Sequence, residues 1–596
     1  MHGGRWRIAA AAALAAVLMA CAGAPGGSKP SEEPGQPVPS SEAPPKSAFP
    51  SPQKLEDLGD VPVPENVFSL DVRKVDRWQL EGPFPTSVGA TPYSEPTAWS
   101  ALLEEAARGR AGLVVPTEAM YCVARELGRF YLAHRSQPTD SLRRFITSRC
   151  HASVAQVGFA YVDGGVSPHH NEAQLYSHWE NAVTEMIRNG VIGGPRTAGI
   201  WFGRSDDHAI VMLVYGYRQV RVEPLSPYVG SDGKLEIEGE ALGPAREIKA
   251  LVNRGRFGVA ACDRAPGVDP PRFHFVCEVD RSDLATQVSV TITPPDRLLS
   301  RGALALLVWP GDETVDVYRL PDYAGPQPVF ESDRVPGDFT DLLNDVRREA
   351  GLGPVELDRV QSQIAAELAP HFFAAVFQRK PEVSADLVAL GMIAGWSVAG
   401  IVQSGHFAAA WVLRTNDLGQ LLATALEYPV SREALLAENI DRIAVGPMLE
   451  TAQGRESVAA VFGTYSLFDE RSHDAVAAEV YAKLEADRRE RGLGAPERLT
   501  DIAGFCRQAA SRVKAGADPA DAMNALLRQS VEVLRTPVAG WVSGTRDLED
   551  LEFPEEYLTS PSLRVAVAVT HHQPEGEPWG RYVVMLVVSE PEGRGV

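Results

Sequence analysis

The chain has 596 residues, and at roughly 150 residues per domain this length predicts about four domains. Hydrophobic residues make up 44% and charged residues 23%, which excludes a wholly disordered or collagen-like chain. Lys and Arg number 57 against 78 Asp and Glu, so the formal net charge is −21. Because phosphate backbones need a basic partner, we expect no nucleic-acid ligand.

The N-terminus predicts an exported, lipid-anchored protein. Arg5 and Arg7 precede an apolar run over 8–19, which is typical of a secretory signal peptide and too short for a permanent membrane span. The junction LMAC resembles the lipobox of bacterial lipoproteins. The resemblance implies that a signal peptide over 1–20 is cleaved and that Cys21 becomes the first residue. Its thiol is then diacylated, and its newly freed amine is acylated as well. Several acyl chains hold a protein stably at a membrane. By the same resemblance, Ala22 in place of Asp after the anchor favours the outer membrane, if the envelope has two membranes. The alternative to a lipoprotein is an ordinary signal peptide, near whose cleavage site Cys21 is incidental.

The segment after the anchor predicts a tether. Residues 22–60 are rich in Pro, Ser, Gly and Glu and contain almost nothing that a core could bury. Such a composition stays extended. We therefore expect a disordered tether over 21–64.

The other cysteines suggest disulfide bonds, because an exported chain meets oxidising conditions. Cys122 with Cys150, and Cys262 with Cys277, are neighbouring pairs within single modules. The fifth, Cys506, falls on an apolar helical face, where a buried thiol is expected.

A building block recurs along the chain. The sequence RREAGLG at 347–353 returns as RRERGLG at 488–494, and a weaker copy, RGRAGL, lies at 108–113. An apolar stripe predicts a helix before each glycine of the second and third copies, and a second amphipathic helix follows in all three. In the second copy that later stripe comprises Val360, Ile364 and Leu368. Each copy closes with two strand-like runs around a polar hairpin, which predicts an α+β fold.

The larger spacing between the first two copies indicates an inserted domain. Residues 223–325 contain short alternating runs broken by Gly, Pro and Asp, typical of an all-β, Ig-like sandwich. The repeats are then expected at 65–222, 335–470 and 471–596.

The repeats resemble the CAP superfamily (cysteine-rich secretory, antigen 5, pathogenesis-related; SCP-like). That family opens with Asn-x-x-Arg-x-x-x-Gly-Leu, which the second copy has as Asn344, Arg347, Gly351 and Leu352. The resemblance implies an α-β-α sandwich in each repeat. Family members with a metal-capable cleft place two His and two Glu around it, one Glu within Gly-Glu-Asn. No Gly-Glu-Asn occurs here, so a degenerate cleft is expected.

One polar cluster is a candidate metal site. His169, His170, His178 and Glu180 supply the nitrogen and oxygen ligands that zinc prefers, provided that the loop folds back onto the following helix. The alternative is a solvated loop that leads into a capped helix. We predict no other cofactor and name no catalytic residue, because no complete nucleophile, phosphate-loop or dinucleotide motif occurs.

A long uncharged run allows a membrane span to be considered. Residues 387–413 contain no Asp, Glu, Lys or Arg. Glycines and polar residues interrupt the run, and the third copy carries charges in the matching flanks, so we expect a buried core segment.

Three functions remain open. The leading hypothesis is a non-enzymatic envelope lipoprotein whose modules bind cell-wall glycan, an envelope protein or a lipid. The alternatives are a metal-dependent hydrolase that uses the His/Glu cluster and a purely structural spacer.

Overall fold

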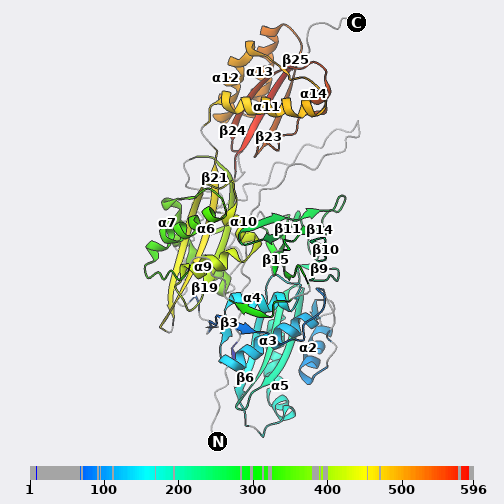
Figure 1. Cartoon of the computed structure of the whole chain (residues 1–596), viewed down its shortest axis with the longest axis vertical. Coiled ribbons are helices and arrows are strands. Elements are labelled where there is room, and N and C mark those ends of the chain that lie inside the picture. Colours follow the sequence, from blue (N-terminus) through cyan, green and yellow to red (C-terminus); the bar gives the residue numbers. More distant parts are fainter. Residues whose placement is uncertain are drawn as a thin grey trace. The chain divides into compact units, whose positions relative to one another are not determined.

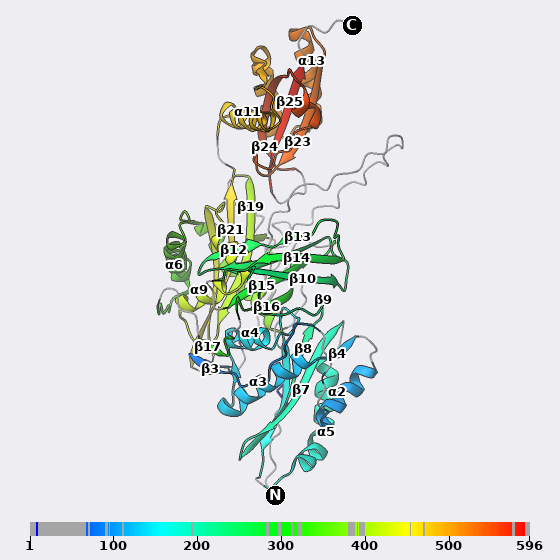
Figure 2. The same cartoon turned by 45° about the vertical axis from the view of Figure 1, so that its right-hand side comes forward.

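Figures 1 and 2 show a computed structural model of the chain. It describes residues 8–9 and 67–589, except 69–71, 90–92, 94–95, 110–112, 168, 192–194, 282–284, 296–299, 312–313, 320–324, 379–387, 390, 393–399, 453, 469–470 and 575–578. The predicted lipidation site Cys21 and the tether lie outside the described residues. None of the helices in the described part is long and apolar enough to cross a membrane.

The chain divides into two compact units. The first contains the described residues up to 464 other than 400–405, and the second contains 400–405 and the residues from 465 onward.

The first sheet unit is a mixed sheet with helices on both faces. Its strands lie in the order β1-β6-β8-β7-β4, and β4 runs parallel to β7 while the other pairs are antiparallel. Alternate residues of β8 separate two apolar cores, one beneath α3 and α4 and the other beneath α2 and α5. The helices are α2 (Ala98–Arg108), α3 (Glu118–His134), α4 (Asp140–Arg149) and α5 (Glu172–Gly190). The strands are β1 (Ile8–Ala9), β4 (Val114–Pro116), β6 (Gly158–Gly165), β7 (Arg196–Arg204) and β8 (His208–Tyr217).

Short pairs of strands join more distant parts of the first compact unit. β2 (Val72–Arg73) runs parallel to β5 (Gln137–Pro138), and β3 (Arg77–Gln79) pairs with β17 (Val317–Arg319). The segment after the sandwich is thereby bound to the segment before the first sheet unit.

An all-β sandwich follows. Two four-stranded antiparallel sheets, β13-β14-β10-β9 and β12-β11-β15-β16, share one apolar core. The first sheet contains β9 (Val220–Val222), β10 (Lys234–Ala241), β13 (Asp263–Arg264) and β14 (Arg272–Glu278). The second contains β11 (Glu247–Arg254), β12 (Gly258–Ala261), β15 (Thr286–Thr293) and β16 (Arg301–Val308).

The second sheet unit has the order β18-β20-β21-β19, with β18 parallel to β20. Its helices include α6 (Val335–Glu349), α7 (Arg359–Gln378), α9 (Leu418–Leu426) and α10 (Pro429–Leu436). Its strands are β18 (Glu356–Leu357), β19 (Val402–Val412), β20 (Arg442–Ala452) and β21 (Arg455–Leu467). The end of the uncharged run 387–413 thus forms a largely buried strand, β19.

The third sheet unit has the order β22-β24-β25-β23, with β22 parallel to β24. Its helices include α11 (His473–Glu490), α12 (Ala503–Lys514), α13 (Pro519–Leu534) and α14 (Glu555–Thr559). Its strands are β22 (Glu497–Arg498), β23 (Val538–Thr545), β24 (Arg564–His572) and β25 (Arg581–Ser589). One core lies beneath α11 and α14, and the other beneath α12 and α13.

The protein is therefore α+β, and its three mixed sheets share one strand order, apart from the additional edge strand β1 of the first. In each, the last strand lies next to the penultimate one, and a short strand runs parallel to that penultimate strand at the edge. The predicted stripe of α7 is wrong at one end, because Val360 is 60% exposed. The helix instead buries Ala365, Leu368, Ala369 and Phe372, so its apolar face starts one turn later than the spacing suggested.

The glycine motif is built alike in the second and third sheet units. Gly351 and Gly492 follow α6 and the end of α11 with φ of 79° and 76°, in the left-handed region that glycine adopts without strain. Leu352 N donates to Arg347 O at 2.8 Å, and Leu493 N donates to Arg488 O at 3.0 Å. In both units the chain that leaves the helix is thereby turned in the same way toward the short parallel strand.

The arginines of this motif are interior groups. Arg347 and Arg488 are 0% and 1% exposed. Arg347 Nε donates to Gly353 O at 2.7 Å, and its Nη1 donates to the carbonyls of Leu435 and Ala437 at the end of α10. Arg488 likewise donates from Nε to Gly494 O, and from Nη1 and Nη2 to two carbonyls of the α14 segment. A buried charge needs such acceptors, and each guanidinium ties its first helix to a later one.

Candidate binding cleft

The predicted metal ligands do not form a metal site in the structure. His169 and His170 lie in the loop before α5, His178 and Glu180 lie on α5, and all four are exposed. The carbonyl of His170 accepts a hydrogen bond from Arg204 Nη1 at 2.6 Å. Within the described part of the chain, no group of three or more His, Cys, Asp or Glu could hold a metal ion.

A polar cluster that the sequence did not indicate lies on the first sheet. Asp163 of β6 accepts hydrogen bonds from Tyr131 of α3 at 2.9 Å and contacts His208 Nε2 of β8 at 2.8 Å. Burial, with Tyr161 and Asp163 nearby, raises the pKa of the Tyr131 phenol. Since the carboxylate is satisfied by its two neighbours, the cluster serves to fasten α3 to the sheet.

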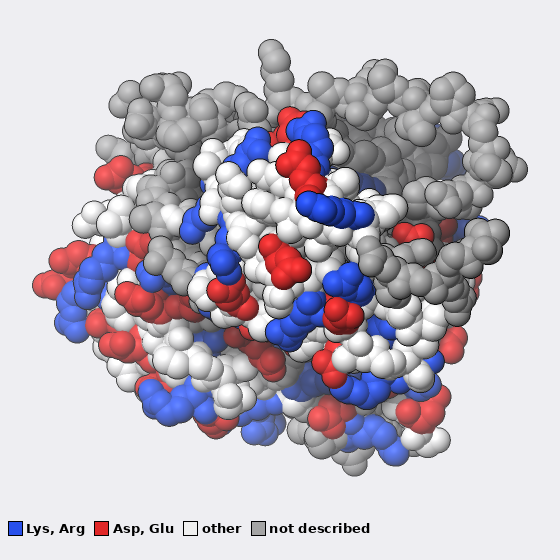
Figure 3. All heavy atoms as spheres, turned by 90° about the horizontal axis from the view of Figure 1, so that it is seen from above, with Lys and Arg blue, Asp and Glu red and all other residues white. Residues whose placement is uncertain are grey.

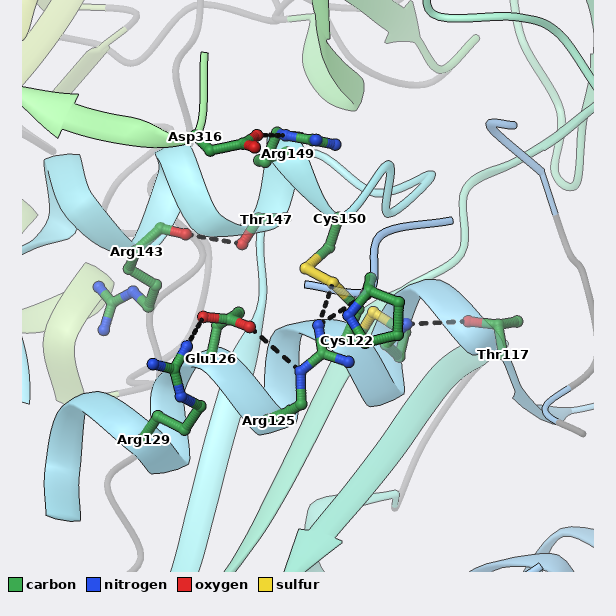
Figure 4. The surroundings of a disulfide bond; sticks show 12 residues. Thr117, Cys122, Arg125, Glu126, Arg129, Arg143, Thr147, Arg149, Cys150 and Asp316 are labelled. Carbon is green, nitrogen blue, oxygen red and sulfur yellow. Dashed lines mark hydrogen bonds and ion pairs between the residues drawn. A yellow bond between two sulfur atoms is a disulfide. The ribbon is translucent and has the colours of Figure 1, made fainter. Parts of the chain in front are cut away.

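Helix α4 is held to the first sheet unit by a disulfide. Cys122 of α3 is bonded to Cys150 at the end of α4, and Figure 4 shows the arginines around this bond. Buried Glu126 accepts from Arg125 Nε at 3.1 Å and from Arg129 Nη1 at 2.8 Å. The second disulfide joins Cys262 and Cys277 in the sandwich, so the bonded pairs are those named from the sequence. Cys506 is a buried free thiol.

The same helix carries ion pairs that join distant segments. Arg144 of α4 and Glu427, which follows α9, lie 3.0 Å apart, and Ser141 Oγ also donates to Glu427. Arg149 pairs with Asp316 at 2.5 Å. Asn253 of β11 donates to the carbonyl of Glu427, which adds the sandwich to the same joint. The first sheet unit, the sandwich and the second sheet unit are thus fastened at one point by largely buried groups.

A cleft of about 570 Å³ lies where the sandwich meets the second sheet unit. This volume is in the range of small-ligand sites. One wall belongs to the sandwich and the other to α10 and the turn after α6. The lining residues are Leu251, Arg254, Arg256, Phe257, Gly258, Val259, Ala260, Ala261, Ala350, Leu352, Glu433, Leu436, Ala437 and Glu438.

The sandwich wall of the cleft is an edge strand. All four residues of β12 line it, and β12 pairs with β11 on one side only within the described sheets. Successive side chains of a strand point to opposite faces. Here Val259 packs beside Leu251 and Val430, whereas Ala260 packs against the sandwich core. A cleft lined by both must run along the outer edge of β12.

Helix α10 forms the opposite wall and is fixed on two sides. Its C-terminal carbonyls accept from buried Arg347. Its own Arg432 donates through Nη1 to the carbonyls of Gly255 and Gly258, at 3.2 and 3.1 Å, in the hairpin that leads into β12. The walls are therefore held at a set separation.

Two acids line the cleft, Glu433 on α10 and Glu438 shortly after it. Glu433 is the more enclosed of the two. Its Oε2 is buried and has no hydrogen-bond partner among the described residues. Burial raises the pKa of this carboxyl, while Lys249 lowers it by a smaller amount. The arginines of the sandwich wall are each paired: Arg254 with Glu278 at 2.7 Å, and Arg256 with Glu349. The cleft thus combines apolar side chains with two acids and two paired arginines, and it is a candidate binding site.

The sequence did not indicate this cleft, because its lining comes from three separate segments, 251–261, 350–352 and 433–438, which meet only in the tertiary fold. The surface charges on one face of the molecule do not point to a second candidate binding site. In Figure 3, Lys and Arg are interspersed with Asp and Glu, and neither sign forms a continuous patch.

Comparison with known proteins assigns no family. No family model and no curated protein matches the chain. Among solved structures, a cysteine-rich secretory protein from Staphylococcus aureus is 8% identical, with 45% of this chain and 85% of that chain covered and a TM-score of 0.17. An extracellular protein containing an SCP domain, from Bacillus anthracis, is 13% identical, with 42% and 83% covered and a TM-score of 0.17. Such low scores do not establish a common fold.

Proposed function

We propose that the chain is a lipid-anchored protein of the bacterial envelope that acts as a non-enzymatic binding scaffold. In this proposal residues 1–20, and with them the edge strand β1, are removed with the signal peptide, and Cys21 carries the anchor. Three CAP-like modules and one Ig-like sandwich follow the tether. The lipobox-like junction supports the anchor. The shared strand order and the matching surroundings of Arg347 and Arg488 support a common origin of the modules.

The cleft beside β12 is the observation that carries the binding role. Its walls come from two domains that are fixed to each other by Arg432 and by the joint around Glu427. Preorganised walls lower the cost of ordering on binding.

Acylation is tested in cells fed a labelled fatty acid. We expect the label on the wild-type chain and its recovery with membranes, and neither with Cys21→Ser, because the acyl acceptor is gone. Label that persists on Cys21→Ser contradicts the anchor.

Binding is tested with envelopes isolated from cells that lack the protein. The purified chain should bind them saturably, and Ala261→Trp, which fills the cleft from its exposed rim, should weaken binding at least about tenfold. Val360→Ala, on an exposed apolar residue outside the cleft, serves as the control and should bind as wild type. Absence of saturable binding leaves the spacer, and hydrolysis of an envelope component supports the hydrolase.

A further inference from the structure

The disulfide between α3 and α4 has a role outside its own sheet unit. We infer that this bond, once closed by oxidation, fixes α4 so that the first sheet unit, the sandwich and the second sheet unit form one body. The inference does not depend on the proposed binding role. It rests on where the bond lies relative to the contacts that α4 makes with the other domains.

Helix α4 presents polar groups of the first sheet unit to the second. Ser141 Oγ and Arg144 Nη2 each donate to Glu427 Oε2 at 3.0 Å. At the start of the same helix, Asp140 accepts from Trp411 Nε1 of β19. Ser141 and Asp140 are adjacent in the chain, so both contacts depend on the position of the first turn of α4.

The contacts with the sandwich lie on the same helix. Arg149 Nε donates to Asp316 Oδ1 at 2.5 Å in the segment after β16, and α4 packs beside β16 itself. Asn253 of β11 donates to the carbonyl of Glu427, so the sandwich and α4 hold the same residue of the second sheet unit. These contacts extend from one end of α4 to the other, and a shift of the helix disturbs all of them.

The disulfide fixes the C-terminal end of this helix. Cys150 directly follows α4, and its partner Cys122 lies on α3, which packs on the first sheet. Leu142 and Ile146 of α4 add apolar packing in the same core. Apolar packing is non-directional, whereas the covalent bond sets the position of α4 against α3. The position of the joint around Glu427 is set with it.

Closing the bond requires an oxidant that itself contains a disulfide. The thiolate of one cysteine attacks a sulfur of the oxidant, and the second cysteine then displaces the oxidant's remaining thiol from the mixed disulfide. The two cysteines lose two electrons and two protons, which convert the oxidant's disulfide into two thiols. Cys122 and Cys150 are 4% and 0% exposed, and Arg125 Nη2 lies 3.7 Å from Cys122 Sγ, so the closed bond is shielded from reductants.

Hydrogen exchange of the full chain in its native state tests the inference at 427–432, in the second sheet unit. There Glu427 N donates to Ala423 O, and Arg432 N donates to Tyr428 O. In C122A/C150A we expect exchange of this segment to become at least about tenfold faster, because α4 no longer holds it in place. C122V/C150A, which refills part of the space, serves if the alanine pair does not fold.

The second disulfide supplies the matched control. C262A/C277A opens a bond inside the sandwich and should leave exchange of 427–432 unchanged. The same variant isolates the oxidation step when it is unfolded, reduced and refolded. Refolding with oxidised glutathione should restore slow exchange of 427–432, and refolding with reduced glutathione should leave it as fast as in the chain that lacks both pairs.

Arg144→Met separates an effect through the joint from a general loss of stability. This variant loses the contact with Glu427 but keeps the disulfide, so opening the bond in its background should no longer change exchange of 427–432.

Three results would overturn the inference. Faster exchange of α3 and α4 without a change at 427–432 would confine the bond to its own unit. Equal acceleration of 427–432 by both disulfide variants would show a general loss of stability. A full effect of the bond in the Arg144→Met background would show that it does not act through the joint.

Discussion

The first sheet unit and the two later ones share a strand order but are stabilised by different means. In the later units a buried arginine follows the helix stripe and binds the carbonyls of a second helix. In the first, the corresponding Arg108 is exposed at the end of α2. That unit instead has a disulfide between α3 and α4 and a fully buried Glu126 between two arginines.

The contrast teaches what the short motif does. Arg and Gly at this spacing matter where the guanidinium reaches the end of a later helix, because that contact fixes the helix. In the second unit this helix is α10, which carries Glu433. The motif is thus linked to the cleft through one buried side chain.

The largest effect is expected from removing that side chain. Arg347→Met and Arg488→Met each leave buried carbonyls unsatisfied, so each should destabilise its unit by about 3–5 kcal/mol. Arg108→Met should change stability by no more than about 0.5 kcal/mol. Denaturant unfolding of the full chain, with hydrogen exchange to locate the unit, measures both. Equal losses at the three arginines would erase the contrast.

The disulfides come next. They close segments with sequence separations of 28 and 15 residues. Restriction of the unfolded chain predicts losses of about 3.6 and about 3 kcal/mol when the pairs become alanine. Thermal unfolding of C122A/C150A and C262A/C277A checks this. A larger loss for C262A/C277A than for C122A/C150A would contradict this expectation, because the longer loop should constrain the unfolded chain more.

Acid should lower the stability of both the first and the second sheet unit, because each contains one buried histidine. Burial, with nearby Arg149, lowers the pKa of His151 to about 4, and burial with Lys249 does the same for His406. An unfolded histidine takes up a proton below about pH 6.5, whereas these stay neutral in the fold. Stability is therefore complete above about pH 6.5 and falls toward pH 4, by about 3 kcal/mol per histidine.

The pH profile of unfolding tests this expectation. His406→Gln should remove one part of the slope between these pH values, whereas Val360→Ala, which changes no titratable group, should leave the slope unchanged. An unaltered slope in His406→Gln would show that this ring is protonated in the folded chain.

The smallest effect is expected at the joint between the regions. Glu427→Gln loses a charged acceptor of Arg144 and Ser141 and should cost about 1.5–3 kcal/mol. Glu278→Gln breaks an exposed pair with Arg254 and should cost at most about 1 kcal/mol. A double-mutant cycle of Arg144 and Glu427 measures the coupling, and a coupling near zero would mean that the joint does not hold the domains together.

The sequence predicted what depends on local periodicity. Phe339, Leu343 and Val346 are buried on one face of α6, and Val480 and Leu484 are buried on α11. The α+β class also followed from helices that precede paired strands. The prediction that Val360 is buried was wrong, because helical spacing gives the width of an apolar stripe but not the residue at which packing begins.

The cleft could not be predicted from the sequence, because nothing in the residues around Glu433 distinguishes it from an ordinary surface acid. Glu433 lies in a short helix that the periodicity did not indicate, and its neighbours across the cleft belong to the sandwich. Asp163 likewise lies in β6 beside His208 of β8, which is 45 residues further along the chain. In both cases the partner is far away in the chain, and only the tertiary fold brings the groups together.

Site-specific crosslinking in living cells tests the central claim most directly. A photoreactive phenylalanine analogue at Leu352 lies in the cleft, and the same analogue at Val360 lies on exposed surface outside it. The account predicts one discrete covalent adduct with an envelope component from position 352, lost with Ala261→Trp, and none from position 360. No adduct from 352, or the same adducts from both positions, would contradict a binding scaffold that acts through this cleft.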